Sequence, residues 1–371
     1  MQLPDLPTPQ VVVDRSRALR NIQRAQEVAA AAGARLRPHA KTHKSPVAAR
    51  WQIEAGAAGI CCAQLGEAEV FAGAGIADIR LPYPINPSNA ARLLALMDRA
   101  AISIIVDHLE VARAWSAVMR RAGRRLDVLV KVDVGFHRCG IDPDADPLAF
   151  VQAIDGLDGL RLRGLLSHAG HAYQAPSERD LRAIALEEAR ILTGLRDRAA
   201  ASGIGIEELS VGATPLLRFA AAQRGITEIR AGNYIYFDRT QVALGSAALD
   251  DCALMVLATV VSKPAPDRII LDCGSKTLTG DQARGFSPMP GYGAILDEGG
   301  TGVDGTLVLE RLSEEHATVR VAGSTRLEPG ARVFVVPNHS CVVSNLVDEI
   351  VLVDGNRILE RMEVAARGRI Q

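Results

Sequence analysis

The sequence predicts an α/β protein in which a (β/α)8 TIM-type barrel is followed by a β-rich domain. Up to about residue 246, short β-branched or apolar runs alternate with helical patterns in about eight pairs, the count of a closed barrel. Beyond that point strands follow one another through short turn-like links. The chain of 371 residues is also too long for one ordinary small domain. We therefore expect a barrel over residues 11–246 and a β-rich domain over residues 247–371, which residues 1–10 join.

The predicted strands of the barrel are short, and helices lie between and after them. An open doubly wound sheet is the alternative, but its first strand should be followed by Gly-x-Gly-x-x-Gly, and the first βα loop holds Lys41 instead. The expected barrel strands are 35–41, 59–64, 79–85, 102–107, 127–134, 162–168, 209–212 and 228–234, and the expected helices are 17–32, 46–57, 66–74, 90–100, 109–122 and 178–201. The expected strands of the second domain are 253–261, 268–271, 306–312, 318–321, 332–336, 349–353 and 358–364, with a glycine-rich loop over 291–305.

Composition limits the function classes. Hydrophobic residues make up 48% of the chain and aromatic residues 4%, so the core is expected to be aliphatic. A net charge of -1 gives no electrostatic case for binding nucleic acid or an anionic membrane. No apolar run is long enough to span a membrane, and the N-terminus lacks a secretion signal. Because the 6 cysteines show no disulfide-framework spacing, we predict a protein of the reducing cytoplasm.

The segment 37–44 reads Arg-Pro-His-Ala-Lys-Thr-His-Lys and contains a lysine in an unusual place. Lys41 is predicted at the carboxyl end of the first barrel strand, in a βα loop, where parallel α/β folds carry their active sites. Positive charge nearby, from Arg37 and His39 among others, favours the neutral, nucleophilic form of Lys41 and suits it to Schiff-base chemistry. The alternative interpretation is a solvated basic loop.

Further candidates follow the later strands of the barrel. Arg138 lies in a loop with two glycines, where its rigid donor fork could bind a cofactor oxygen. After the next strand come His168 and Tyr173, and histidines grouped with a tyrosine favour a site over a polar core group. The last two strands are followed by residues that could bind phosphate through backbone amides and hydroxyls, namely Gly212 and Thr214, then Gly232, Asn233 and Tyr234. Together with Lys41 these loops predict pyridoxal 5'-phosphate (PLP) as the cofactor, although each alone could be an ordinary turn.

His339 and Cys341 form a His-x-Cys pair just after an expected strand of the second domain. At strand spacing both side chains point to one face, where imidazole and thiolate could bind one metal ion. Two protein ligands leave open positions, as in catalytic metal sites. The alternative is a buried cysteine beside a surface histidine.

The segment 37–44 together with Pro-Asn-His-Ser-Cys at 337–341 resembles the fold-type III PLP enzymes of the D-threonine aldolase and D-serine dehydratase family. That resemblance covers nearly the whole chain and implies an alanine-racemase-like barrel, a β domain and a homodimer. The catalytic residues that we predict are Lys41 and His168, the cofactor-binding residues are Lys41, His39, Arg138, Tyr173, Gly212, Thr214, Gly232, Asn233 and Tyr234, and the metal ligands are His339 and Cys341.

The metal pair departs from part of the family that it resembles. The better-known bacterial D-threonine aldolases carry His-x-Asp, which suits manganese or magnesium, whereas His-x-Cys resembles the zinc-dependent dehydratases. The segment 83–85, Tyr-Pro-Ile, leans the same way. Because a thiolate is a soft ligand, we expect zinc, with manganese or magnesium as alternatives.

The resemblance implies a lyase that acts on a D-3-hydroxy amino acid. In the aldolase reaction, which we place first, a base such as His168 removes the proton of the metal-bound β-hydroxyl, and cleavage of the Cα–Cβ bond yields glycine and an aldehyde. In the dehydratase reaction Lys41 removes the Cα proton, and a 2-oxo acid and ammonia form. An amino-acid racemase and a non-catalytic PLP carrier are further alternatives, and the second domain argues against the carrier.

Overall fold

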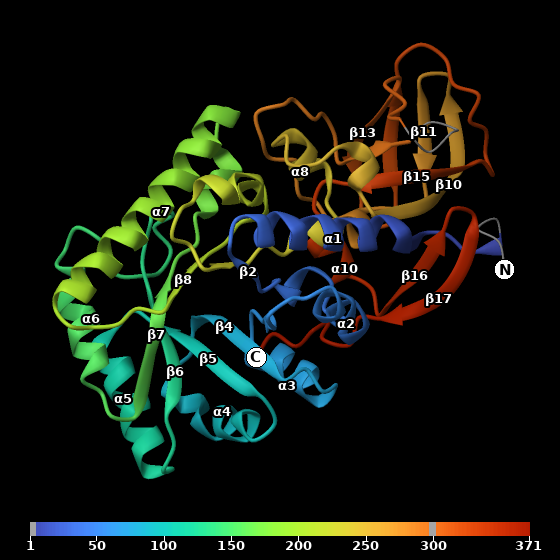
Figure 1. Ribbon diagram of the computed structural model, residues 1–371. Coiled ribbons are helices and arrows are strands. Elements are labelled where there is room, and N and C mark those ends of the chain that lie inside the picture. The colour runs from blue at the N-terminus through green and yellow to red at the C-terminus, as the bar shows by residue number, and fades with distance from the viewer. Residues whose placement is uncertain (1–4, 297–301) are drawn as a thin grey trace. The chain divides into compact units, whose positions relative to one another are not determined.

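The structure is a computed structural model that describes residues 5–296 and 302–371 (Figure 1). The chain forms two compact units. The barrel unit contains residues 24–41, 48–232 and 368–371, and the strand unit contains the described residues up to 23, residues 42–47 and the described part of 233–367. Each unit is therefore assembled from separate pieces of chain. The domain boundary between residues 246 and 247 stays a prediction.

The barrel unit is built on a sheet of eight parallel strands in the order β2-β9-β8-β7-β6-β5-β4-β3. A parallel bridge between His39 and Cys61, with Cys61 N donating to Pro38 O at 2.8 Å, joins the first and last strands of this order. These contacts close the sheet and confirm the predicted barrel class. The strands are β2 (Arg35–Leu36), β3 (Ile60–Cys61), β4 (Asp78–Pro84), β5 (Ala101–Val106), β6 (Leu126–Lys131), β7 (Leu160–Leu166), β8 (Glu208–Val211) and β9 (Glu228–Ile229).

Helices alternate with these strands, as the βα rhythm predicts. The longest helix begins after Ser177, whose hydroxyl accepts a hydrogen bond from Asp180 N at 3.2 Å and so caps the first turn. Figure 1 shows α5, α6 and α7 beside the strands β5 to β8. The helices are α1 (Arg15–Ala31), α2 (Pro46–Glu54), α3 (Leu65–Gly73), α4 (Ala90–Met97), α5 (Leu109–Arg121), α6 (Pro147–Asp155) and α7 (Glu178–Ala201), with the 3-10 turns η2 (Ala40–Thr42), η3 (Pro87–Asn89), η4 (Gly170–Gln174) and η5 (Thr214–Ala222).

Four barrel strands are shorter than predicted, namely those expected at 35–41, 59–64, 127–134 and 228–234. The first ends at Leu36, and backbone hydrogen bonds from Arg37 N to Ile229 O and from His39 N to Ala231 O follow it before the chain turns through η2, so Lys41 lies in a 3-10 turn. The last ends at Ile229, and η6 (Asn233–Ile235) occupies the end of the segment 228–234. Both carboxyl ends are therefore loops, where side chains can be presented to a ligand.

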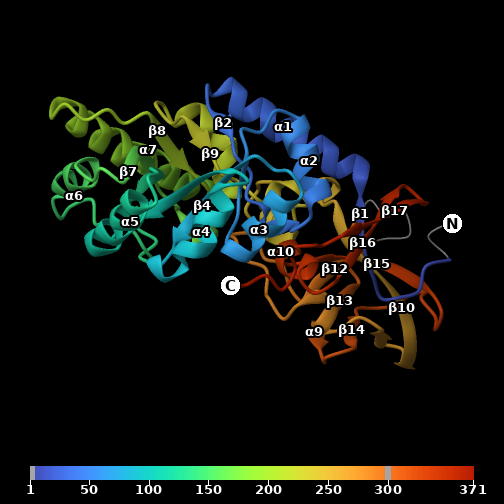
Figure 2. The same ribbon diagram turned by 90° about the horizontal axis from the view of Figure 1, so that it is seen from below.

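The strand unit contains a sheet of nine strands (Figure 2). Its main path is β13-β14-β11-β10-β1-β16-β17, and β15 pairs with β10 and β12. β1 pairs antiparallel with β10 and parallel with β16, so the N-terminal strand belongs to this sheet. The strands are β1 (Gln10–Asp14), β10 (Leu254–Ala265), β11 (Arg268–Leu271), β12 (Gly293–Ile295), β13 (Leu307–Leu312), β14 (Ala317–Val321), β15 (Arg332–Pro337), β16 (Glu349–Asp354) and β17 (Arg357–Glu363), and the short helices are α8 (Arg239–Ala243), η7 (Leu249–Asp251), α9 (Ser275–Leu278) and α10 (Ser340–Ser344).

The glycine-rich segment 291–305 is only partly a loop. β12 occupies residues 293–295 and pairs with β15, whereas residues 297–301 of the segment lie outside the described residues. Among the described residues no helix combines the length and apolarity needed to cross a membrane.

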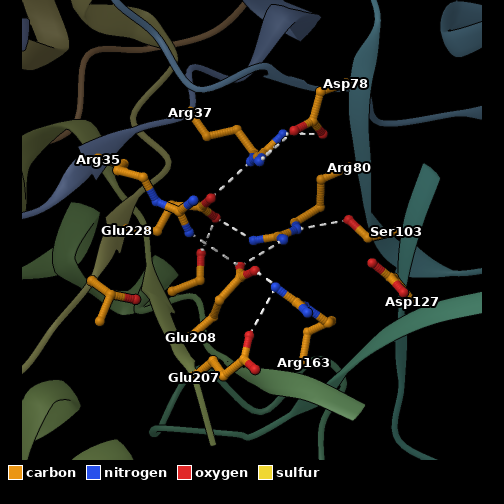
Figure 3. Close-up of polar contacts among 12 residues, drawn as sticks. Arg35, Arg37, Asp78, Arg80, Ser103, Asp127, Arg163, Glu207, Glu208 and Glu228 are labelled. Carbon is orange, nitrogen blue, oxygen red and sulfur yellow. Dashed lines mark hydrogen bonds and ion pairs between the residues drawn. The ribbon is translucent and has the colours of Figure 1, made fainter. Parts of the chain in front are cut away.

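Charged side chains, rather than only aliphatic ones, are buried among the barrel strands (Figure 3). Glu228, which is 0% exposed, accepts hydrogen bonds from Arg37 Nε at 2.7 Å, from Arg80 and from Ser210 Oγ at 2.6 Å. Burial opposes the carboxylate, but the charges of Arg80 and Arg37 lower the pKa of Glu228 to about 2. Arg80 also binds Glu208 Oε2 at 2.8 Å. This buried network ties β2, β4, β8 and β9 together by ion pairs.

Candidate functional site

Lys41 lies at the centre of η2, in the loop that follows the first barrel strand, and it is exposed. The backbone of His39 just before it is held by a hydrogen bond from His39 N to Ala231 O at 3.0 Å. The loop that carries Lys41 is therefore anchored to the segment that follows β9. An exposed primary amine on an anchored loop is suited to forming a Schiff base with a carbonyl compound.

The other basic residues of this loop have partners of their own. Arg37 binds both Glu228 and Asp78, so opposite charges compensate its charge. His43 Nδ1 accepts a hydrogen bond from Ser45 N at 3.1 Å, and Lys44 Nζ donates to Asn345 Oδ1 at 2.8 Å. Arg37 and Lys44 are therefore bound by other side chains, and His43 accepts a hydrogen bond through a ring nitrogen that carries no proton, so these residues are not a group of free positive charges around Lys41.

His168 follows β7 and is in contact with residues from two other loops of the barrel unit. Its Nδ1 lies 2.6 Å from the carbonyl oxygen of Gly212. Its ring packs edge-on against Phe136, with 5.6 Å between the ring centroids, and the guanidinium of Arg138 lies 5.1 Å from the same Phe136 ring. The structure thus brings the predicted residues His168, Gly212 and Arg138 together.

The protonation state of His168 follows from this environment. Burial, and after it the charge of Lys41, lower the pKa of His168 well below its ordinary value, so the imidazole is neutral at pH 7. Since a carbonyl oxygen can only accept a hydrogen bond, Nδ1 carries the proton and Nε2 has the free lone pair. His168 is therefore prepared to accept a proton at Nε2.

The remaining predicted residues of the barrel unit are placed as follows. A Cβ atom on Gly212 would lie 2.9 Å from the carbonyl oxygen of Arg230, so only glycine allows this close approach of two loops. Thr214 begins η5 and is buried, and Tyr173 lies on η4. Gly232 ends the barrel unit. These residues therefore lie in the segments that follow β7, β8 and β9 in the chain.

The charge of this region fits an anionic cofactor such as PLP. The Nζ atom of Lys131 is buried and has no hydrogen-bond partner among the described residues. Burial, and after it Arg230, lower the pKa of Lys131 to about 7. Lys41, Lys131 and Arg138 each lower the pKa of His168, which shows that cationic groups gather around it. A phosphate-bearing group would compensate this excess of positive charge.

His339 and Cys341 are brought together in the strand unit, although not by a strand. β15 ends at Pro337, His339 is the residue before α10, and Cys341 lies in the first turn of that helix. Burial opposes the charges, but their hydrogen bond to each other raises the pKa of His339 to about 9 and lowers the pKa of Cys341. The helical turn, rather than strand spacing, places imidazole and sulfur side by side.

The donor set of this pair fits a metal with open coordination positions. Imidazole nitrogen and thiolate sulfur are the ligands that zinc prefers. Within residues 5–296 and 302–371, no group of three or more His, Cys, Asp and Glu side chains is arranged to hold a metal ion. His339 and Cys341 would therefore supply two ligands and leave the other positions to water or substrate.

Several residues that the sequence analysis missed support this pair. Asp281 Oδ2 lies 2.6 Å from Nδ1 of His339. Asn338 Nδ2 donates to the carbonyl oxygen of Asp281 at 3.0 Å, and Arg239 Nη1 donates to Asn338 Oδ1 at 2.8 Å. No local pattern marks Asp281, because it is separated from His339 by 58 residues of chain and joins it only in the folded unit.

Asn233 and Tyr234 belong to the strand unit and differ in their surroundings. Asn233 Nδ2 donates to Asp238 Oδ2 at 2.7 Å and lies 3.4 Å from Cys341 Sγ, so its amide nitrogen is directed to the His-x-Cys loop. Asp238 Oδ2 also accepts from Ser340 N at 3.0 Å. Tyr234 is 0% exposed. These contacts and this burial do not test whether Asn233 and Tyr234 bind a phosphate, so that role stays a prediction.

Comparison with known proteins agrees with this fold. The family model of the alanine racemase N-terminal domain matches residues 13–240, and a serine dehydratase domain model matches residues 253–353. The chain is 36% identical to a D-threonine aldolase of Arthrobacter sp, over 97% of this chain and 93% of that protein. It is 35% identical to the D-threo-3-hydroxyaspartate dehydratase of Delftia sp. strain HT23, over 91% of each.

A solved structure shows the same architecture over the whole length. The D-threonine aldolase from Filomicrobium marinum superposes with a TM-score of 0.90 at 28% identity, covering 100% of this chain and 98% of that one. Aldolases and dehydratases occur side by side among the relatives, and neither group is clearly more similar. From the matched domains and the full-length similarity, the chain belongs to the family of D-threonine aldolases and D-serine dehydratases with an alanine-racemase-type barrel.

Proposed function

We propose that this protein is a PLP- and divalent-metal-dependent lyase that cleaves a D-3-hydroxy amino acid to glycine and an aldehyde. The observation that carries the proposal is the neutral His168, with its Nε2 lone pair free, in the same barrel unit as the exposed amine of Lys41. Relatives with D-threonine aldolase activity in their names support the reaction class. PLP when bound supplies an electron sink and zinc when bound supplies a Lewis acid at the substrate hydroxyl.

The roles of the residues follow from their chemistry. Lys41 would bind PLP through its amine, and His168 would accept the proton of the β-hydroxyl at Nε2. His339 and Cys341 would hold the metal. The residues proposed to bind the cofactor with Lys41 are His39, Arg138, Tyr173, Gly212, Thr214, Gly232, Asn233 and Tyr234. We further propose a barrel domain over 11–246, a β-rich domain over 247–371, a cytoplasmic location and a homodimer.

A dehydratase that yields a 2-oxo acid and ammonia is the second candidate. The His-x-Cys pair favours it through its resemblance to the zinc-dependent dehydratases, whereas the softness of the thiolate selects zinc but does not fix the reaction. The similarity to the D-threo-3-hydroxyaspartate dehydratase supports it as well. In this reaction the amine of Lys41 would remove the Cα proton, and His168 would stay a hydrogen-bonding residue.

Product analysis distinguishes the candidates. Chelator-treated protein with PLP is supplied with zinc, manganese or magnesium in turn and given D-threonine or D-serine, and glycine and 2-oxo acids are measured separately. We expect glycine and acetaldehyde from D-threonine, and no turnover before metal is restored. A 2-oxo acid without glycine would replace the aldolase by the dehydratase. Formation of the L-enantiomer in the presence of chelator would indicate a racemase, and no turnover with any metal would indicate a carrier.

Substitution of the proposed metal ligands tests the division of roles between the two sites. We expect His339→Ala and Cys341→Ala to retain the visible absorbance of bound PLP and to lose turnover, because the cofactor is assigned to other residues. An unchanged turnover rate in either variant would refute the proposed metal ligands.

A further inference from the structure

The sulfur of Cys341 has two hydrogen-bonding neighbours outside its own loop. Thr42 Oγ1 lies 3.2 Å from Cys341 Sγ, and Asn233 Nδ2 lies 3.4 Å from it. Thr42 is 0% and Asn233 is 6% exposed, and both belong to the strand unit with Cys341. The sulfur is therefore contacted by two buried polar groups that are distant from it in sequence.

The surroundings of both groups determine which atoms donate. Asp238 Oδ2 accepts from the nitrogen of the Asn233 amide at 2.7 Å, which assigns that atom as the nitrogen, and Ser340 Oγ lies 3.0 Å from it. An amide nitrogen can only donate, and of its two hydrogens one is taken by Asp238 while the other is available to Ser340 Oγ and to the sulfur. A metal-binding thiolate accepts hydrogen bonds, so the hydroxyl of Thr42 must donate. The backbone of Thr42 is fixed in turn, because Ser344 Oγ donates to its carbonyl oxygen.

We propose that Thr42 and Asn233 are positioning residues that hold the Cys341 sulfur in place as a metal ligand and withdraw charge from it through two hydrogen bonds. This inference rests on the proposed metal site. Residues that hydrogen-bond to a metal-binding side chain set both the orientation of that side chain and its strength as a donor to the metal. A thiolate that shares charge with two donors gives less to the metal, which leaves the metal a stronger Lewis acid for the substrate hydroxyl.

Both donors are neighbours in sequence of residues that are proposed to bind PLP. Thr42 directly follows Lys41, and Asn233 directly follows Gly232. Both donors therefore come from segments that also carry residues proposed to bind PLP. A change in either segment should alter the metal ligand as well as the cofactor site.

The test replaces the hydroxyl of Thr42 while keeping its shape. Full-length protein with PLP is loaded with cobalt(II), and the thiolate-to-cobalt charge-transfer band and the cobalt affinity are measured for wild type, Thr42→Val, Thr42→Ser and Asn233→Ala. Thr318→Val, on strand β14, is the matched control. Circular dichroism verifies that each variant is folded.

We expect Thr42→Val to bind cobalt about 10-fold more weakly, because the loss of a group that positions the ligand outweighs the stronger donation of a sulfur with one hydrogen bond fewer. Its charge-transfer band should move to lower energy, because a hydrogen bond lowers the energy of the sulfur lone pair from which the electron comes. Thr42→Ser keeps the hydroxyl and should resemble wild type, as should Thr318→Val. Asn233→Ala should move the band in the same direction as Thr42→Val. If Thr42→Val does not fold, the band energy of Asn233→Ala tests the proposed hydrogen bonds to the sulfur instead.

The two ways in which the inference could fail are separable. Wild-type protein that binds cobalt without a thiolate band would overturn both the metal site and this inference. A normal band in wild type that stays at the same energy and affinity in Thr42→Val and Asn233→Ala would overturn this inference alone and leave the proposed function intact.

Discussion

At the scale of single residues, burial decides the protonation states on which the proposed chemistry depends. His168 is neutral because burial and the charge of Lys41 disfavour the imidazolium. His339 is charged without a metal because its hydrogen bond to Cys341 outweighs the cost of burial. Two histidines of the same chain therefore have opposite shifts of pKa, and each shift suits a different role, proton acceptor and thiolate partner.

Lys41 is the residue on which cofactor binding depends. We expect Lys41→Ala to lose the visible absorbance of protein-bound PLP and to lose turnover, because no other residue is assigned to bind the aldehyde covalently. Absorbance spectra after incubation with PLP and gel filtration provide the measurement. Lys276→Ala is the control, since Lys276 pairs with Glu314 and Glu315 on the surface of the strand unit. A visible band that survives in Lys41→Ala would contradict the assignment.

Asp281 should orient the imidazole of His339 for metal binding. Because its Oδ2 lies 2.6 Å from Nδ1, Asp281 holds that nitrogen as the donor and directs Nε2 to the metal. We expect Asp281→Asn to weaken zinc binding about 10- to 100-fold, measured by competition with a zinc indicator. Asp348→Asn, which breaks an exposed pair with Arg367, should bind zinc as wild type does. Equal affinities for the two variants would show that Asp281 does not orient His339.

At the scale of elements, the strands β2 and β9 are short, and side chains provide part of what holds them. Each has two residues in the ladder, but Arg37 just after β2 and Glu228 in β9 form an ion pair at 2.7 Å. Arg80 of β4 joins the same carboxylate. The loop that carries Lys41 is thus attached to the barrel by charge as well as by backbone hydrogen bonds.

Removing the central charge of this network should destabilise the barrel. Glu228→Gln leaves Arg37 and Arg80 buried with less opposite charge, so we expect the free energy of unfolding in urea to fall by about 3–5 kcal/mol. Glu349→Gln, which breaks a surface pair with Arg361, should cost at most about 1 kcal/mol. Similar losses in both variants would mean that the buried network does not stabilise the fold more than a surface pair does.

At the scale of the whole molecule, the network predicts how stability depends on pH. The pKa of Glu228 is about 2 in the folded protein against an ordinary value of 4.5, so its contribution is complete above 4.5 and is lost as the pH falls towards 2. We expect the difference in unfolding free energy between wild type and Glu228→Gln to shrink as the pH falls from about 5 towards about 2. A difference that stays constant over this range would show that Glu228 has no lowered pKa.

Much of the fold could be predicted from local patterns. Helix 178–201 begins and ends where the sequence predicts, because its cap and its hydrophobic periodicity are local signals. The ends of β2 and β9 could not be predicted, since backbone hydrogen bonds such as that from His39 N to Ala231 O continue past both strands and no local signal marks where the regular ladder stops. Charged residues such as Arg35 and Arg37 stand two positions apart on several of the expected strands. Because that spacing directs side chains to the same face, it was the available signal for the buried network.

Local patterns predict the barrel class, the β-rich second part, the position of Lys41 in a βα loop and the His-x-Cys pair, since each of these depends on residues that are close in the chain. The groups that contact these residues become known only in the folded protein. Thr42 meets Cys341 across 299 residues, and Arg37 meets Glu228 across 191. Periodicity reports whether a side chain is buried and does not report its partner, because the partner is chosen by how separate segments pack.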